Sequence, residues 1–285
     1  MVFLQTSLPN IKVIWVFLMN KFIEKVRSIL YEPNVLDVDV DAPELIKIHS
    51  EMLQKKPLLK STFTWFYRRM MFLRCKYLNQ SGLELELGSG VGFFKSINPM
   101  LITSDVRSSA NVDMLIDAQN INLPSESVSC VYAINVLHHI PNPELFFDEL
   151  SRVLISGGGS VLVEPHGGFC SSFLHKYMHK DEHFDKTAIN WISNSSGPLS
   201  GANQALSYII FERDIDLFNK KYAGRLHIEK KEYCINSIRY LLSGGLNFRQ
   251  LVPNFLLPFI ILIEYILKPI SKLWSLHQIV IIKKI

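Results

Sequence analysis

The sequence contains little cysteine, and its cysteines lie far apart. Four of them, Cys75, Cys130, Cys170 and Cys234, are spread over 285 residues without a CxxC pair. A disulfide framework and a structural zinc site both require cysteines, or cysteines and histidines, at short characteristic spacings. The sequence therefore predicts neither, and a reducing compartment such as the cytoplasm fits it best.

Long apolar runs are also missing. A membrane-spanning helix needs about 20 consecutive apolar residues, but the run from Val13 ends at Asn20, and the run from Phe255 contains Pro258 and stops at Glu264. The first residues include neither a charged n-region nor a small-residue cleavage site, so we do not expect a secretory signal. We expect a cytoplasmic protein.

The excess of positive charge is small, with 30 Lys and Arg against 26 Asp and Glu. This balance speaks against nucleic acid as the main partner. A local basic cluster, interleaved with aromatic residues, is compatible with lipid headgroups, a phosphorylated substrate or nucleic acid, although the pattern is more typical of a helix with a solvated basic face. The cluster consists of Lys55, Lys56, Lys60, Arg68, Arg69, Arg74 and Lys76.

Apolar residues recur at helical spacing between Ile11 and Leu30, next to several basic residues. The pattern favours a helix that packs on its own domain. Peripheral contact with the inner face of the membrane remains the alternative, because amphipathic basic helices also bind lipid surfaces.

Short apolar segments alternate with helical patterns in the middle of the chain, and each apolar segment ends in a polar residue. Because parallel strands need crossover connections, this alternation predicts an α/β fold with a parallel sheet that helices cover on both faces. The expected strands are Leu83–Leu87, Leu101–Ser104, Val112–Ile116, Val128–Ile134 and Ser160–Val163, with a helix over Pro143–Leu154 that closes at Gly157, Gly158 and Gly159.

The alternation stops after Pro165, where Gly, Ser, Asn and His accumulate, and this change indicates an inserted cap. Two later strands, Leu226–Tyr233 and Gln278–Lys284, are expected to complete the sheet, with an apolar helical segment between them. The predicted organisation is an N-terminal helical region over 1–80, a ligand-binding core over 81–165, the cap over 166–224 and a C-terminal region over 225–285.

A glycine-rich loop, Glu86-Leu87-Gly88-Ser89-Gly90-Val91-Gly92, follows the first strand of the core. A dinucleotide-binding loop has the spacing GxGxxG, which would place its third glycine at Phe93. The spacing here is GxGxG, and its glycines let the backbone pass close beneath a ligand. With no pyrophosphate to bind, Glu86 suits a zwitterion that carries an ammonium group.

At these residues the chain resembles the class I S-adenosylmethionine (SAM) dependent methyltransferases of the type 11 small-molecule branch, over about Gly82 to Pro165. The resemblance implies a Rossmann-like, seven-stranded, mostly parallel sheet, and SAM as the cofactor. It assigns the methionine part of SAM to the loop, the ribose to the end of the second strand, the adenine to the next turn and the methyl group to the end of the fourth strand. The implied cofactor-binding residues are Glu86, Gly88, Ser89, Gly90, Gly92, Asp105, Asp117, Ala118 and Asn135.

The segment downstream of the core resembles a bacterial branch of these enzymes, through Ser196–Asn203, Ile210–Asp214 and Leu241–Gly245. Members of that branch often serve cell-surface polysaccharide or glycolipid pathways. The resemblance thus implies a small-molecule or lipid-linked glycan acceptor. Ser129 and Ile155-Ser156 depart from the family pattern, and these departures concern the subfamily more than the activity.

Methyl transfer to a hydroxyl requires alignment of donor and acceptor and removal of a proton. Histidine is the natural base near neutral pH. His139 and His166 are expected just beyond the carboxyl ends of the fourth and fifth strands, with Glu164 beside them, where ligands gather in open α/β sheets. These three are the candidate catalytic residues, and a structural role for either histidine is equally open.

A second histidine group, His175, His179 and His183, would share one face of a helix. We predict no metal site there, because no supporting pattern of further ligands can be read. The polar segment Ser195–Asn203 is predicted to form a lid over the acceptor.

The leading hypothesis is a SAM-dependent methyltransferase that acts on a hydroxyl of a cell-surface glycan precursor. A non-catalytic SAM-binding or scaffold protein is the second hypothesis, and an RNA methyltransferase that uses the basic cluster is the third.

Overall fold

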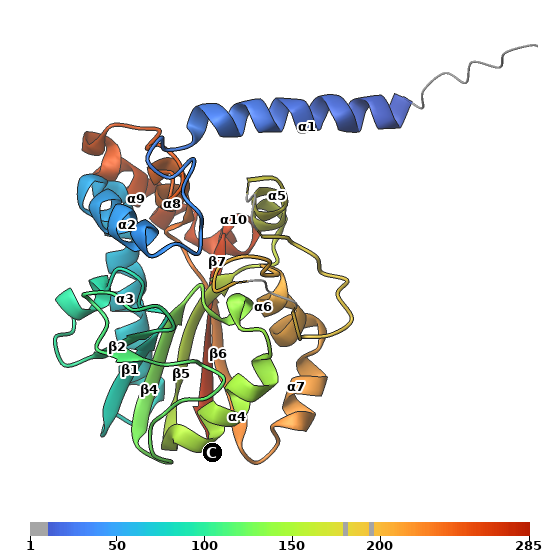
Figure 1. The fold of residues 1–285 in the computed structure, drawn as a ribbon. Coiled ribbons are helices and arrows are strands. Elements are labelled where there is room, and N and C mark those ends of the chain that lie inside the picture. The colour runs from blue at the N-terminus through green and yellow to red at the C-terminus, as the bar shows by residue number, and fades with distance from the viewer. Residues whose placement is uncertain (1–10, 179–181, 194–196) are drawn as a thin grey trace, which may run out of the picture.

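A seven-stranded sheet forms the centre of the computed structural model, which describes residues 11–178, 182–193 and 197–285 (Figure 1). The strand order is β3-β2-β1-β4-β5-β7-β6, in which β7 runs antiparallel to its neighbours β5 and β6 and the other pairs are parallel. The strands are β1 (Leu83–Leu87), β2 (Ile102–Asp105), β3 (Met114–Leu115), β4 (Val128–Ile134), β5 (Leu154–Pro165), β6 (Leu226–Tyr233) and β7 (His277–Lys284).

Side chains of the central strands alternate between two apolar cores. Val131 and Ala133 of β4 belong to the core beneath α4 (Pro143–Val153), whereas Cys130 and Tyr132 belong to the core beneath α3 (Pro57–Tyr77). A strand that is buried on both faces favours apolar residues at every position, and β4 departs from this only at Ser129, whose hydroxyl donates a hydrogen bond to the Leu83 carbonyl at 3.0 Å. The expected sheet, mostly parallel and covered on both faces, is confirmed.

Part of the segment expected to form a cap packs on the sheet instead. Phe211 and Phe218 are fully buried in the same core as α4. They belong to η3 (Ile209–Arg213) and α7 (Ile215–Lys221), which follow the short α6 (Leu206–Tyr208). The loop between α5 (Phe169–Met178) and α6 also reaches this core, because Trp191 is buried in it. The domain division stays a prediction.

The three consecutive glycines lie inside β5 and not at the end of α4. A Cβ on Gly159 would overlap with the Ile282 carbonyl oxygen of β7 and come within 2.7 Å of Leu78 Cδ2. The glycine is required because the neighbouring strand and the end of α3 both approach the backbone closely. The strand therefore starts directly at Leu154, six residues earlier than the sequence pattern indicates.

The N-terminal helices differ in how they pack. α1 (Ile11–Leu30) projects away from the sheet, whereas α2 (Pro43–Lys55) leads into α3 (Figure 1). Phe22 and Ile29 of α1 are 67% and 61% exposed, so at these positions the helix does not pack on its own domain as the pattern favoured.

Much of the basic cluster on α2 and α3 is engaged in ion pairs. Lys56 pairs with Glu32, Arg69 with Glu232 and Arg74 with Glu84, and each of these cations is at most 35% exposed. These contacts hold α3 to its neighbours, which leaves less positive charge for an extended partner.

A series of short helices connects β6 to β7: α8 (Ser237–Ser243), η4 (Asn254–Leu256), α9 (Leu257–Ile266), η5 (Lys268–Ile270) and α10 (Ser271–Trp274). Two further 3-10 turns, η1 (Phe93–Ser96) and η2 (Leu137–His139), follow β1 and β4. Within the described ranges, none of the helices combines the length and apolarity that crossing a membrane requires.

Candidate active site

The glycine loop connects β1 to η1 at the carboxyl edge of the sheet. Gly88, Gly90 and Gly92 have φ values of +64°, +50° and +66°, a region that side chains disfavour. A Cβ on Gly88 would overlap with Val136 Cγ2, and one on Gly92 would come within 2.6 Å of Asn111 Cβ. A Cβ on Gly90 would meet no described atom within 4 Å, because this glycine borders open space.

That open space is a cavity of about 390 Å³ over the ends of β1, β2 and β4. Its volume lies in the range of small-ligand sites. The cavity brings together predicted cofactor-binding residues from four separate segments of the chain, namely Gly88, Gly90, Asp105, Asp117, Ala118 and Asn135.

Asp105 at the end of β2 ties the loop to the neighbouring strand. Its Oδ2 atom accepts a hydrogen bond from the Gly90 backbone N–H at 3.0 Å, and its Oδ1 atom accepts one from the Arg107 N–H at 2.9 Å. Arg107 also lines the cavity, and its Nε atom lies 3.6 Å from Asp105 Oδ1. Its buried Nε and Nη1 atoms have no hydrogen-bond partner among the described residues. Sequence reasoning missed Arg107, although its place two residues after Asp105 was an available signal.

Asn135 has two unfavourable features that are typical of a ligand-binding residue. Its φ of +55° is uncommon for a residue other than glycine. Its Oδ1 atom is buried and finds no hydrogen-bond donor within the described ranges. An unpaired buried acceptor costs about 1–3 kcal/mol, so a donor on a bound cofactor would relieve that cost.

Asp117 and Ala118 form the turn after β3. Asp117 is exposed and its Oδ1 atom accepts a hydrogen bond from the Gln119 N–H at 2.8 Å, while Ala118 is buried against the cavity floor. The side-chain amide of Gln119 donates to both carboxylate oxygens of Asp117, at 3.3 and 3.4 Å.

Three predicted cofactor-binding residues, Glu86, Ser89 and Gly92, are not among the residues that line the cavity. Ser89 donates its N–H to the Ser104 carbonyl at 2.8 Å, and its Oγ atom accepts the Ser104 N–H at 3.0 Å. Glu86 is buried below the loop, and burial raises the pKa of its carboxyl to about 8. In the structure these residues support the loop from beneath.

Of the three candidate catalytic residues, only His139 lines the cavity. Glu164 is fully buried under η2, where its Oε1 atom accepts the Val136 and Leu137 N–H groups at 2.9 and 2.8 Å. His166 lies at the end of β5, with its Nε2 atom 3.3 Å from the Lys272 carbonyl and its ring against Tyr233. Neither Glu164 nor His166 is placed to contact a ligand in this cavity.

Glu164 acts on the site through the histidine that precedes His139. Its Oε2 atom lies 2.6 Å from Nδ1 of His138, which fixes the orientation of that imidazole. Burial raises the pKa of Glu164 to about 7 and lowers that of His138 to about 3. Burial thus favours the uncharged imidazole, whose Nε2 atom faces Glu182 of the cap.

A carboxylate from the cap, Glu182, meets both histidines. Its oxygens lie 3.9 Å from His138 Nε2 and 3.7 Å from His139 Nε2, and it also accepts a hydrogen bond from Gln204. The ligand atoms of the three residues lie within 4.8 Å of one another, so this set could hold a divalent cation. The sequence prediction contained no metal ligands, and it missed Glu182 because the contact joins segments far apart in the chain.

The second histidine group of the sequence analysis does not come together as a cluster among the described residues. His175 is buried on α5, His183 pairs with Asn203 through a β-bridge, and His179 lies outside the described residues.

The imidazole of His139 is neutral at physiological pH. Burial lowers its pKa well below the usual value, and the neighbouring His138 adds to the effect. Its Nδ1 atom is buried without a hydrogen-bond partner among the described atoms, whereas Nε2 faces Glu182. A proton on Nε2 would leave Nδ1 as a free acceptor.

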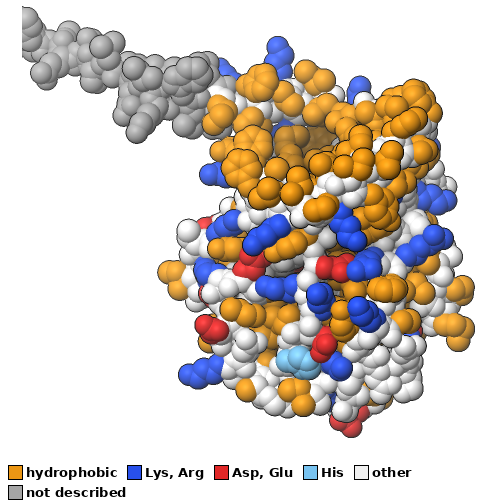
Figure 2. Space-filling view, turned by 180° about the vertical axis from the view of Figure 1, so that it is seen from behind, with side chains coloured by type: hydrophobic (Ala, Val, Ile, Leu, Met, Phe, Trp, Pro, Cys, Tyr) orange, Lys and Arg blue, Asp and Glu red, His pale blue; other side chains and the backbone are white. Residues whose placement is uncertain are grey.

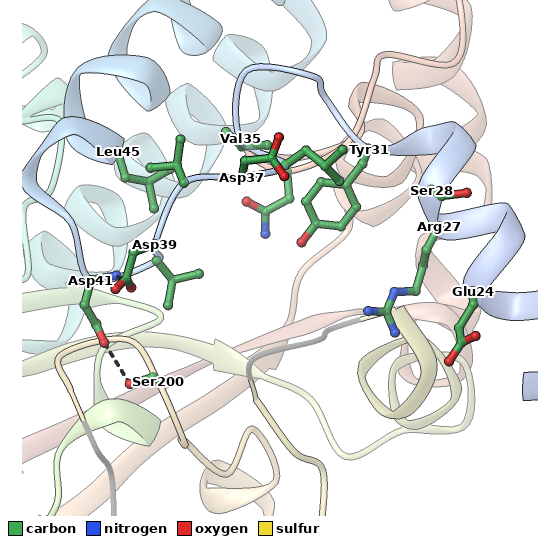
Figure 3. Close-up of a pocket in the computed structure, with 14 residues that line it drawn as sticks. Glu24, Arg27, Ser28, Tyr31, Val35, Asp37, Asp39, Asp41, Leu45 and Ser200 are labelled. Carbon is green, nitrogen blue, oxygen red and sulfur yellow. Dashed lines mark hydrogen bonds between the residues drawn. The ribbon is translucent and has the colours of Figure 1, made fainter.

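The segment predicted as a lid reaches the cavity. Gly197, Pro198 and Leu199 line it, while residues 194–196 lie outside the described ranges. Asp41 holds this segment from the N-terminal side, because its carboxylate accepts the Leu199 N–H at 2.6 Å and the Ser200 hydroxyl at 2.7 Å (Figure 3).

A larger cavity of about 920 Å³ is lined by the next residue of this segment, Ser200. Its walls are α1, the segment over 31–45 and Ser200, and Figure 3 shows carboxylates from different parts of the chain around it. Its charged lining consists of Glu24, Arg27, Asp37, Asp39 and Asp41.

Comparison with known proteins agrees with this geometry. Residues 85–162 match the family model described as a methyltransferase domain. No curated protein sequence matches the chain.

Solved structures with similar folds include a SAM-dependent methyltransferase from Thermotoga maritima, with 14% identity over 84% of this chain and 99% of that chain and a TM-score of 0.47. Geranyl diphosphate C-methyltransferase from Streptomyces coelicolor A3(2) has 13% identity over 90% and 88% of the two chains and a TM-score of 0.45. A SAM-dependent methyltransferase from Archaeoglobus fulgidus has 16% identity over 78% and 94%, with a TM-score of 0.43.

Proposed function

We propose that the chain is a class I SAM-dependent methyltransferase, with SAM as the cofactor, that methylates a hydroxyl group of a small or lipid-linked acceptor, namely a cell-surface glycan precursor. The match of residues 85–162 to the methyltransferase-domain model supports the enzyme class. The observation that carries the proposal is a pair of cavities lined by neighbouring residues of one segment, Gly197–Leu199 and Ser200, with His139 in the smaller cavity.

The smaller cavity suits SAM in its donor groups and in its shape. The open space over Gly90 accommodates the methionine part, Asp105 and Asp117 offer carboxylate oxygens to ribose and adenine, and the unpaired Asn135 Oδ1 atom accepts a hydrogen bond. When bound, SAM would supply a sulfonium methyl group, which an acceptor oxygen attacks in line with the thioether as the leaving group. The chain contributes the alignment of the two reactants, which lowers the barrier without covalent chemistry.

His139 is the proposed general base. It would accept the acceptor's hydroxyl proton as the new carbon–oxygen bond forms and the carbon–sulfur bond breaks, with the bonding pair remaining on sulfur. Its lowered pKa keeps the imidazole unprotonated, and its unpaired Nδ1 atom is an available proton acceptor. Glu164 and Glu182 are positioning residues in this proposal, since they orient the two imidazoles.

The larger cavity is the proposed site for the body of the acceptor, whose reacting hydroxyl has to reach His139 in the smaller cavity. Sugar hydroxyls bind well to carboxylates, and three aspartates line this space. A lid shared with the cofactor cavity would exclude water when both ligands are bound. A lipid-linked acceptor would also require the enzyme to work at the inner face of a membrane, and we include this peripheral location in the proposal.

The first test is thermal unfolding with and without SAM, with NADH as the control ligand. SAM at 100 times its dissociation constant should stabilise the protein by about 2.7 kcal/mol, which raises the melting temperature by a few degrees. Gly90→Arg should abolish the shift. Gly224→Arg is the matched control, because Gly224 also has a positive φ and no neighbour within 4 Å among the described atoms, but it lies outside the site.

The second test is transfer of labelled methyl groups from SAM to a panel of sugars and polyprenyl-diphosphate-linked sugars. Labelled product that His139→Ala abolishes supports the proposal. A SAM-induced shift without transfer to any hydroxyl acceptor would instead support the non-catalytic SAM-binding hypothesis. The RNA hypothesis receives less support, because Lys56, Arg69 and Arg74 are paired with carboxylates.

A further inference from the structure

We propose that an apolar face at one end of the molecule docks on the surface of an anionic lipid bilayer. Eight large apolar side chains between residues 255 and 273 are 46–70% exposed, and two from α5 join them. Figure 2 shows hydrophobic side chains gathered over this end of the molecule. The apolar face consists of Phe255, Phe259, Leu262, Ile263, Tyr265, Ile266, Ile270 and Leu273 with Phe169 and Phe173.

One side of α9 is packed against the rest of the protein. Ile260 and Glu264 are buried, and the Glu264 carboxylate pairs with the Arg239 guanidinium at 2.9 Å. The remaining sides of α9 therefore present aliphatic and aromatic groups outward. Contiguous apolar surface of this kind is rare on monomers and marks an interaction site.

The charges near the face favour anionic lipid as the partner. Glu264 is the only carboxylate between residues 249 and 276, and its ion pair with Arg239 is buried. Lys268, Lys272 and Lys176 are exposed on the elements that carry the face. Figure 2 shows Lys and Arg side chains around its border. Basic residues beside apolar ones are attracted to anionic headgroups while the apolar side chains insert.

The dimensions favour a surface location for these helices. α9 has 10 residues and is about 15 Å long, half the thickness of a bilayer core. The phenyl and phenol rings of Phe255, Phe259 and Tyr265 suit the boundary between headgroups and acyl chains. The helices would thus lie within the interface, with the sheet outside the bilayer.

The face also stands at the functional end of the molecule. α10 packs against α5, and both lie on the same side as α1, beyond the carboxyl edge of the sheet where the site lies (Figure 1). Docking would therefore hold the active-site end close to the lipid surface. The inference rests on the surface alone and does not depend on the proposed acceptor.

The test is co-sedimentation of the full chain with vesicles of phosphatidylglycerol and phosphatidylcholine, compared with vesicles of phosphatidylcholine alone. We expect strong binding to the anionic vesicles, which weakens as salt concentration rises. The double variant Phe259→Glu/Ile266→Glu should bind at least tenfold less, because two side chains can no longer insert. Lys268→Ala and Lys272→Ala should each weaken binding to anionic vesicles about fivefold.

The matched control is the double variant Leu145→Glu/Leu217→Glu, which changes two exposed leucines on α4 and α7, and it should bind like the wild type. All variants should keep the melting temperature and the SAM-induced shift of the wild type. Equal sedimentation of Phe259→Glu/Ile266→Glu and the wild type would overturn the inference. It would also be overturned if vesicles bind nothing and light scattering detects a dimer that the same variant dissociates.

Discussion

At the scale of single residues, Asn135 combines two features that destabilise the free protein and that a bound ligand would compensate. Its positive φ and its unpaired buried amide oxygen both destabilise the free protein. Neither feature contributes to the packing of β4, so a bound cofactor is the natural source of compensation.

Asn135→Gly should separate these effects. Glycine adopts the same backbone conformation without strain, so we expect the stability of the free protein to change by less than about 1 kcal/mol. Loss of the amide should weaken SAM binding about tenfold, as expected for one hydrogen bond. Calorimetric titration measures the affinity. Glu126→Gly, at another residue with a φ of +55°, should leave it unchanged, and a similar loss in both variants would assign the effect to the backbone.

Protonation of His139 should slow the reaction only at an unusually low pH. Because its pKa is lowered well below 6.5, the imidazole stays unprotonated, and the acid limb of the rate profile should fall below pH 6.5. His139→Ala should reduce kcat by about 10²–10⁴-fold with little change in SAM affinity. His227→Ala, on β6, serves as the control. A variant that retains full kcat would remove His139 from the mechanism.

Glu86 should make the free protein less stable at high pH. Burial raises its folded pKa from 4.5 to about 8, so the folded state binds the proton more tightly than the unfolded state. This contribution is fully present below pH 4.5 and is lost as pH rises through about 8. Melting temperatures between pH 6 and pH 9 should therefore fall more steeply for the wild type than for Glu86→Gln. Parallel curves would show that Glu86 is ionised in the fold.

At the scale of elements, β1, β4 and β6 occur at the residues that the sequence predicts. The local signal differs among them: β4 is a largely apolar run buried along its length, whereas β1 and β6 mix apolar with charged residues. The start of β5 was not predictable in this way, because the close approach of Ile282 and Leu78 decides that Gly159 belongs to a strand.

The residues of the candidate site were likewise predictable only where a local sequence signal exists. Gly88, Gly90 and Asp105 could be predicted because their roles follow from a loop and from a strand end. Glu182 and Asp41 reach the site through contacts between distant segments, for which the sequence offers no periodic signal. His139 and His166 were both candidate bases, because strand order alone does not say which side chain faces the cavity.

One carboxylate of the N-terminal segment, that of Asp41, holds the segment that is proposed to act as a lid. Asp41→Ala removes both hydrogen bonds to Leu199 and Ser200, so we expect faster opening and weaker retention of ligands. The dissociation constant for SAM should rise about fivefold to tenfold, as the loss of these bonds predicts. Stopped-flow measurements should find the change in the off-rate. Asp37→Ala, which lines the same large cavity, should have no such effect.

At the scale of the whole molecule, the sheet depends on its last strand. β7 lies between β5 and β6 and pairs with both, so without it β6 could not join the sheet. Deleting residues 277–285 should abolish cooperative thermal unfolding, because two strands lose their partners and both cores lose buried residues. Deleting residues 11–30 should preserve it, since α1 projects from the body. Calorimetry distinguishes the two outcomes.

The position of the short apolar helices between β6 and β7 has a consequence for biosynthesis. A chain grows from its N-terminus at about 5–20 residues per second, so α9 leaves the ribosome before β7 can complete the sheet. During that interval the apolar helices are already in contact with water while the central strands still have an open edge. A nearby bilayer could shelter them at this stage, and the nascent chain would then acquire its final orientation on the lipid before it finishes folding.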